Sequence, residues 1–180
     1  MEWEFSILYA LQEIHNPILD KIMLFITALG EGGFFWIAIG VICLAFQKHR
    51  KMGLQLLLSM LATVIIGNLI IKNIVARPRP CDDLEAIKNI TMLVERPHGY
   101  SFPSGHSINS MVAAVALFLN NKKIGIPAVI IATLIGFSRM YLFVHFPTDV
   151  IAGFAIAILV AIGVDWAFRQ VQIKMLNKKS

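Results

Sequence analysis

Charged residues and cysteines are both scarce in this sequence. Asp, Glu, Lys and Arg make up 15% of the 180 residues, whereas an average soluble domain contains about 25%. Two cysteines are too few for a disulfide scaffold or a zinc ribbon, and an apolar content of 57% excludes a disordered or collagen-like chain. The net charge of +5 does not indicate nucleic-acid binding, because the basic residues lie between long apolar runs and form no soluble face. We therefore expect an integral membrane protein.

The apolar runs predict an all-α bundle of six transmembrane helices. Residues 52–71 carry no formal charge and as a helix would measure about 30 Å, the thickness of a hydrocarbon core. Residues 17–47 are too long for one span, and Glu31-Gly32-Gly33 in their middle predicts a tight turn between two short spans. The six predicted spans are residues 17–30, 33–47, 52–71, 104–120, 124–143 and 150–168.

The segment before these spans has a different pattern. In residues 1–16, apolar residues at helical spacing alternate with acidic and amide residues, which predicts an amphipathic helix in the membrane interface. An extension of the first span is the alternative. The acidic start of residues 1–16 and the lack of a cleavage site argue against a secretory signal. We expect residues 1–180 to form a single membrane domain, with the six spans in residues 17–168 and a cytoplasmic tail in residues 169–180.

Basic residues in short loops predict the orientation of the bundle. Six spans place three basic clusters and both termini on one side, which is then the cytoplasm; if residues 17–47 were one span, only the N-terminus would change sides. The clusters are Lys48, Arg50 and Lys51; Lys122 and Lys123; and Arg169, Lys174, Lys178 and Lys179. The opposite face keeps six cations, which a bound anion would explain: Lys72, Arg77, Arg79, Lys88, Arg96 and Arg139.

Three polar motifs fall on that opposite face. Residues 72–80, KNIVARPRP, follow a span, and taken alone their cations could simply anchor a helix end. Residues 100–107, YSFPSGHS, begin a helix with Ser104 as a candidate N-cap, where free N–H groups favour an anion. In residues 138–149, SRMYLFVHFPTD, an Asp follows a His by four residues, so the carboxylate can orient the imidazole and leave its other nitrogen as a nucleophile.

In order and spacing, the three motifs resemble the signature of the type 2 phosphatidic acid phosphatase family. The matching residues are Lys72, Arg79-Pro80, Pro103-Ser104-Gly105-His106, Ser138-Arg139, His145 and Asp149. The resemblance covers residues 20–168 and implies the membrane branch of the family. It also implies a catalytic set in which His145 attacks phosphorus to form a phosphohistidine, Asp149 fixes the tautomer of His145, and His106 protonates the leaving oxygen. The implied phosphate-binding groups are Lys72, Arg79, Ser104, the Gly105 backbone and Arg139.

A metal site is the competing interpretation of the two histidines and the aspartate. The motif cations would repel a divalent ion, and the family needs none, so we expect no metal and no other cofactor. The roles of Glu31, His98 and Asp165 stay open.

The expected activity is hydrolysis of a lipid phosphate or diphosphate in the cell membrane, at its extracytoplasmic face. Undecaprenyl diphosphate is favoured over phosphatidylglycerophosphate and phosphatidic acid as the substrate. A lipid phosphotransferase using the same phosphohistidine and a non-catalytic membrane scaffold are the alternatives. The bilayer and the lipid phosphate are the expected partners, nucleic acid is not, and the sequence gives no oligomeric state.

Overall fold

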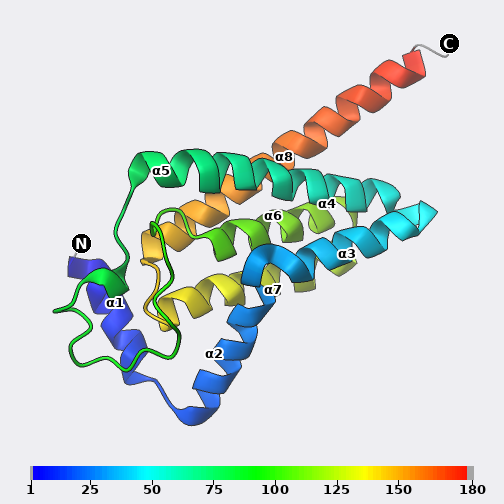
Figure 1. Ribbon diagram of the computed structural model, residues 1–180. Coiled ribbons are helices and arrows are strands. Elements are labelled where there is room, and N and C mark those ends of the chain that lie inside the picture. Colours follow the sequence, from blue (N-terminus) through cyan, green and yellow to red (C-terminus); the bar gives the residue numbers. More distant parts are fainter. Residues whose placement is uncertain (1, 178–180) are drawn as a thin grey trace.

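The computed structural model describes residues 2–177, and over this range the chain is helical and contains no strands (Figure 1). The all-α prediction is therefore confirmed; Lys178 and Lys179 lie outside the described residues. The elements are α1 (Glu2–Glu13), α2 (Pro17–Leu29), the 3-10 turn η1 (Glu31–Gly33), α3 (Phe34–Ala45), η2 (Gln47–His49), α4 (Arg50–Thr63), the π-helical η3 (Val64–Ile71), α5 (Lys72–Val75), η4 (Pro80–Asp82), α6 (Gly105–Asn120), α7 (Lys122–Tyr141) and α8 (Pro147–Asn177).

Polar caps define where several helices begin. Asn16 accepts hydrogen bonds from the first turn of α2, Ser104 from the first turn of α6, and Asn121 from the first turn of α7. Pro147 opens α8, a position where its missing N–H costs nothing. The predicted N-cap at Ser104 is confirmed, and α8 runs on to Asn177, through most of the predicted tail.

The structure does not confirm the predicted count of six spans. Among the described residues, three helical stretches are long and apolar enough to cross a membrane: Gln47–Val75, Lys122–Tyr141 and Pro147–Met175. The 16-residue helix α6 is shorter than these. Helices α2 and α3 form a pair bent by 42°, which would be a fourth candidate if counted as one span.

The bent pair replaces the tight turn that the glycines of η1 predicted. Gly32 and Gly33 have φ angles of 56° and 71°, in the left-handed region that glycine tolerates. These two residues change the direction of the chain between α2 and α3 without reversing it. Residues 17–47 are therefore not an antiparallel pair of short spans.

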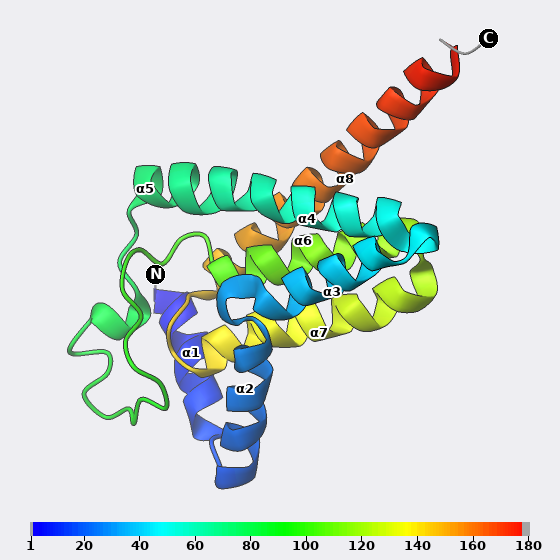
Figure 2. The same cartoon turned by 45° about the vertical axis from the view of Figure 1, so that its right-hand side comes forward.

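The two termini lie at opposite ends of the bundle (Figures 1 and 2). Helix α1 packs at the end where α5 stops and α6 starts, whereas the end of α8 projects from the other side. This arrangement argues against the prediction that both termini lie on one side of the membrane, because the α2–α3 pair does not turn the chain back. Leu8 of α1 is fully buried, while Trp3 and Ile7 are exposed; a location of α1 in the membrane interface remains a prediction.

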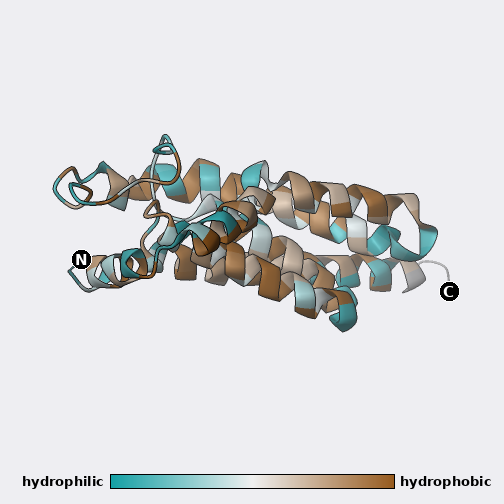
Figure 3. Cartoon of the chain, turned by 90° about the horizontal axis from the view of Figure 1, so that it is seen from below, coloured by the Kyte–Doolittle hydropathy of each residue, from teal (hydrophilic) through white to brown (hydrophobic). Residues whose placement is uncertain are grey.

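Helix α6 lies at the centre of the bundle, where it packs against α4, α7 and α8. Its inner positions carry small side chains, including Ala113, Ala114 and Ala116, which let the neighbouring helices approach closely. Trp36 of α3 donates a 3.0 Å hydrogen bond to the hydroxyl of Ser110. Hydrophobic residues dominate the middle of the helices, and hydrophilic residues are most frequent at the two ends of the bundle (Figure 3).

The end opposite α1 collects the basic clusters. Lys51 donates to Gln172 of α8 at 3.3 Å. One surface pocket at this end is lined by Lys48, His49, Lys51, Met52, Asn120 and Asn121. Asp165 is part of this end, since it accepts from Gln55 at 3.0 Å and from Arg169 at 2.7 Å. These contacts lie at the end of the bundle away from the three motifs.

Candidate active site

Three backbone breaks bring the motifs together at the α1 end of the bundle. Ala76, with a φ of 47°, ends α5 and turns residues 77–80 across the end of the bundle. The loop 98–103 leads into α6, and the loop 142–146 joins α7 to α8, with Phe143 at a φ of 59°. Non-glycine residues rarely adopt such angles, and they cluster where a fold holds functional groups. His145 lies in the last of these loops.

His145 is held between Arg79 and Asp149. Nη1 of Arg79 lies 3.1 Å from Nε2 of His145, and Oδ2 of Asp149 lies 3.5 Å from Nδ1. A guanidinium has donors only, so Nε2 must accept and carries the lone pair, while the proton sits on Nδ1. The contact thus fixes the tautomer that a nucleophilic Nε2 requires.

The electrostatics of the loop keep His145 neutral. His145 is 2% exposed. Burial lowers the pKa of His145 from 6.5 to about 4, with a further lowering by Arg79 and Arg139 and an opposing contribution from Asp149. Protonation would add a charge beside two guanidinium groups in a dry site. The imidazole is therefore unprotonated at neutral pH.

Asp149 is fully buried and receives hydrogen bonds from several directions. Its Oδ2 accepts from the hydroxyl of Ser101 and from the Phe146 N–H at 2.8 Å, and its Oδ1 accepts from Arg77 at 2.7 Å. Ser101 Oγ also lies 3.4 Å from Nδ1 of His145. Because Ser101 donates to Asp149, its oxygen is free to accept the Nδ1 proton, so it bridges a pair whose direct contact is long.

Arg79 is anchored by backbone carbonyls on three sides. It donates to Gly99 at 2.9 Å, to Val144 at 3.0 Å and to His98 at 3.4 Å. His98 thus contributes its carbonyl, while its side chain is exposed. Arg79 as a whole is 5% exposed. Its hydrogen bonds hold the guanidinium in place, which pre-orients the positive charge beside His145.

The start of α6 forms a second wall of the site. The Ser104 N–H donates to the Asp149 carbonyl at 3.2 Å, and its hydroxyl accepts from Ser107. A Cβ on Gly105 would lie 4.0 Å from Nζ of Lys72, so this ammonium group stands over the helix start. Lys72, Ser104 and Gly105 therefore share the positive end of a helix, where an anion is favoured.

Arg139 and His106 face α2 and the η1 turn. Arg139 is 5% exposed and donates to Thr27 at 2.6 Å. His106 packs so closely on Gly30 that a Cβ there would lie 2.8 Å from the ring. Nε2 of His106 lies 3.4 Å from the exposed carboxylate of Glu31, without the geometry of a hydrogen bond. The groups that act electrostatically on His106 include Arg139, His145, Arg79 and Lys72, so all three motifs converge.

Sequence reasoning missed the residues that orient the site from outside the signature positions. Ser101 lies inside the second motif, three residues before Ser104, and was given no role. Arg77 was counted as a cation of the outer face, although it bonds Asp149. Thr27 and Gly30 lie in α2 and its cap, where nothing in the sequence marks them. Only the approach of distant helices defines their roles.

The donor set fits an anion better than a metal. Within residues 2–177, no group of three or more His, Cys, Asp or Glu side chains is arranged to hold a metal ion. Asp149 is already engaged by Arg77, Ser101 and a backbone N–H. The remaining groups are cationic or neutral donors, the set that binds phosphoryl oxygens.

Known proteins share this sequence pattern and this fold. The chain is 36% identical over 137 residues to an undecaprenyl-diphosphatase of Sulfolobus acidocaldarius, an alignment that covers 75% of this chain and 64% of that relative. It is 31% identical to the undecaprenyl-diphosphatase BcrC of Bacillus subtilis, over 81% of this chain and 73% of the relative. A solved PAP2-type phosphatidylglycerolphosphate phosphatase of Bacillus subtilis superposes with a TM-score of 0.76 at 30% identity, covering 94% of this chain and 86% of the other.

The family assignment rests on more than half of the chain. The pattern of the PAP2 superfamily matches residues 52–174, the stretch that carries all three motifs. The apolar helices and the membrane phosphatase with the same fold identify a membrane protein. The resemblance drawn from the ordered motifs is confirmed: the chain belongs to the PAP2 superfamily.

Proposed function

We propose that this chain is a membrane-embedded phosphatase that hydrolyses a lipid phosphate or diphosphate through a phosphohistidine at His145, without a metal ion. The observation that carries the proposal is the contact of Arg79 with Nε2 of His145, at 3.1 Å. This contact places the lone pair of His145 on Nε2, the nitrogen that faces the Arg79 guanidinium. A phosphoryl group bound by that guanidinium would lie within reach of the lone pair. Membership of the PAP2 superfamily supports the same chemistry.

In the first step, Nε2 of His145 attacks phosphorus as the bond to the leaving oxygen breaks. Lys72, Arg79 and Arg139 bind the equatorial oxygens and neutralise the charge that builds on them, together with the N–H groups at the start of α6. His106, which takes up a proton once the negative phosphoryl group offsets the surrounding cations, gives that proton to the leaving oxygen. Asp149, with Ser101, holds the Nδ1 proton and stabilises the cationic phosphohistidine.

In the second step, water attacks the phosphohistidine. His106, now neutral, takes a proton from that water, and the bond between phosphorus and Nε2 breaks to release phosphate. His145 returns to its neutral form, which its burial favours. The two histidines thus exchange roles as proton donor and acceptor through one cycle, while His145 alone carries the covalent bond.

The names of the relatives favour undecaprenyl diphosphate as the substrate. Two of them are undecaprenyl-diphosphatases, and the solved structure is of a phosphatidylglycerolphosphate phosphatase. Both substrate types combine a phosphoryl group with a long apolar tail, which suits a site at the end of an apolar bundle. Phosphatidylglycerophosphate and phosphatidic acid are the competing substrates.

The test is a panel of pure lipid phosphates, given to the protein in detergent with and without excess chelator. Phosphate release should be fastest from undecaprenyl diphosphate, unchanged by chelator and absent in His145→Ala. No release from any lipid would contradict the proposal, and loss of activity in chelator would favour a metal site. Transfer of labelled phosphate to an added acceptor lipid, in place of release, would identify a phosphotransferase.

The active site is proposed to face the outside of the cell membrane. The clusters Lys48–Lys51 and Lys122–Lys123 and residue Arg169 lie toward the other end of the bundle, and basic clusters mark the cytoplasmic side. Since α1 packs at the active-site end, the N-terminus is then outside and the end of α8 is inside.

Cysteine labelling tests this orientation in intact cells. In a Cys43→Ser, Cys81→Ala background, cysteine at exposed Asn89 should react with an impermeant maleimide. Cysteine at exposed Gln47, between α3 and α4, should react only after the membrane is opened. The reverse pattern would place the active site in the cytoplasm.

A further inference from the structure

Helix α1 contributes a buried carboxylate to the active-site end. Glu4 is 4% exposed, although it lies on the first turn of the chain and outside the residues that the PAP2 pattern matches. Glutamate is seldom buried unless it is paired. Its partners are Arg77, at 2.6 Å, and Thr148, whose hydroxyl donates at 2.6 Å and whose N–H donates at 3.4 Å.

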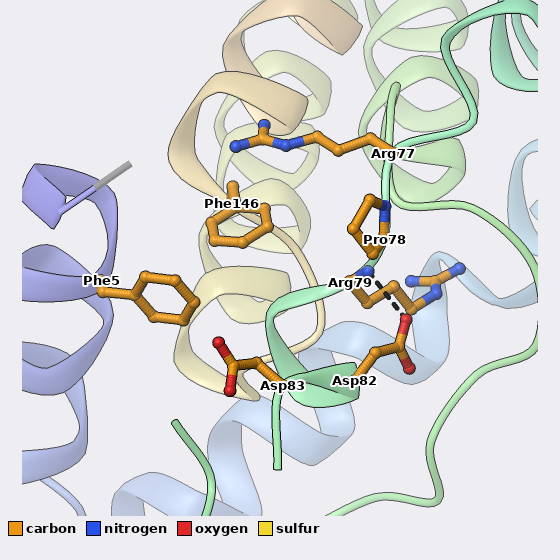
Figure 4. Close-up of a pocket in the computed structure, with 7 residues that line it drawn as sticks. All are labelled: Phe5, Arg77, Pro78, Arg79, Asp82, Asp83 and Phe146. Atoms are coloured by element: carbon orange, nitrogen blue, oxygen red, sulfur yellow. Dashed lines mark hydrogen bonds between the residues drawn. The ribbon is translucent and has the colours of Figure 1, made fainter. Parts of the chain in front are cut away.

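Of these partners, Arg77 links Glu4 to Asp149 of the catalytic pair. One nitrogen of the Arg77 guanidinium, Nη2, bonds Glu4, and the other, Nη1, bonds Oδ1 of Asp149 at 2.7 Å. Arg77 also lies over the ring of Phe146, 4.0 Å from its centroid, which fixes the plane of the guanidinium (Figure 4). The order of contacts is Glu4, Arg77, Asp149, His145.

The charges along this series explain why a carboxylate is needed. Arg77 alone would neutralise Asp149 and weaken its hold on the Nδ1 proton of His145. With Glu4 on its other edge, the guanidinium is shared between two carboxylates, and the three groups together keep a net charge of −1. That charge opposes the positive charge that His145 acquires when it bonds phosphorus.

We propose that Glu4 is a positioning residue of the active site, which acts through Arg77 to keep Asp149 available to His145. The N-terminal helix is then part of the catalytic apparatus and has a function beyond anchoring. The inference rests on the proposed function, because it assigns Glu4 to the step in which His145 becomes phosphorylated. Glu4 makes no contact with the cations that would bind the phosphoryl group.

The test compares Glu4→Gln with Glu13→Gln, a matched change at an exposed position of the same helix. The first readout is turnover of the full-length protein on the best lipid of the panel. Glu4→Gln should lower kcat about 10-fold and leave KM unchanged, because losing a direct partner of a metal-bound histidine costs about 10- to 100-fold and Glu4 acts on His145 only through Arg77 and Asp149. Glu13→Gln should behave as the unmodified protein.

The second readout needs no lipid. Vanadate imitates the five-coordinate transition state by bonding Nε2 of His145, whereas inorganic phosphate needs only the cations. In Glu4→Gln the Kd for vanadate should rise about 10-fold, while the Kd for phosphate stays the same or falls, because a negative charge has been removed. A general distortion of the site would weaken both anions, and that result would overturn the proposal.

Arg77→Met completes the experiment. If Glu4 acts through Arg77, then adding Glu4→Gln to Arg77→Met should leave the ratio of the vanadate and phosphate Kd values unchanged. The double variant removes the charges of Glu4 and Arg77 together, while Asp149 keeps its hydrogen bonds from Ser101 and the Phe146 N–H, so this comparison also decides if Glu4→Gln alone fails to fold. A further loss in the double variant would overturn the proposal. An unmodified protein inactive on every lipid would refute the proposed function, while the vanadate comparison would still test Glu4.

Discussion

Replacing Ser101 by alanine tests whether the catalytic pair depends on a bridging hydroxyl. In the structure this hydroxyl donates to Oδ2 of Asp149 and lies 3.4 Å from Nδ1 of His145. Without it, Asp149 keeps Arg77 and the Phe146 N–H, but it contacts His145 only across 3.5 Å. The variant removes one link and leaves every charge in place.

The expected loss follows from the type of hydrogen bond. A bond to a charged group contributes about 1.5–3 kcal/mol, which corresponds to roughly 10- to 150-fold in rate if it acts fully in the transition state. The bridge stabilises His145 only as it becomes cationic, so the loss should fall on kcat. KM should not change, because Ser101 is not among the cations that bind phosphate.

The assay is steady-state turnover together with rapid-quench measurement of phosphohistidine formation. Ser59→Ala is the matched control, since Ser59 is 1% exposed on α4 and its hydroxyl has no hydrogen-bond partner in the described part of the chain. Phosphohistidine should form more slowly in Ser101→Ala and at the normal rate in Ser59→Ala. A change of less than twofold, or a rise in KM alone, would refute the reasoning.

Three further predictions concern the histidines and the packing around them. His145→Ala should abolish turnover, whereas His106→Ala should lose about 10²–10⁴-fold, the scale of a general acid; retained activity in folded His145→Ala would exclude it as the nucleophile. Because the pKa of His145 is about 4 when folded and 6.5 ordinarily, its neutral form stabilises the fold by about 3 kcal/mol above pH 6.5, and this is lost as the pH falls toward 4. Thermal unfolding in detergent should therefore shift more with acid than it does in His145→Gln. Gly30→Ala would place a Cβ 2.7 Å from Ile135 and 2.8 Å from His106, so turnover should fall toward that of His106→Ala, while Gly163→Ala, with open space around it, should keep full activity.

The three motifs were predictable because their chemistry is local. Each has its cap, proline or four-residue spacing within a dozen residues, and the elements that hold it are long helices that end close by. Ser104 caps α6 as its position before Gly105 and His106 predicts. The convergence of the motifs on one end then follows from antiparallel helices of similar length.

The arrangement of α1, α2 and α3 could not be predicted in the same way. Length and the Glu31-Gly32-Gly33 sequence together favoured a reversal at residues 30–33, since a straight helix over residues 17–47 is too long for a bilayer. A bend of 42° at Gly32 and Gly33 satisfies the same limit by changing direction without reversing it. The buried position of Glu4 is equally hidden, because its pattern fits an amphipathic helix and its partners lie more than 70 residues away.

The site leaves buried polar atoms without hydrogen-bond partners, and this lowers the stability of the fold. Among the described residues, the buried side-chain atoms without a hydrogen-bond partner include Nε of Arg139 and Nε2 of His106. Each unmet buried group costs about 1–3 kcal/mol, and more if it is charged. The bundle could avoid this cost with apolar residues, which the neighbouring helices use freely. These two atoms lie on different helices, and Arg79 acts electrostatically on both side chains. An anion that both atoms contact explains them better than packing does, since bound phosphoryl oxygens would supply the acceptors that the fold itself does not.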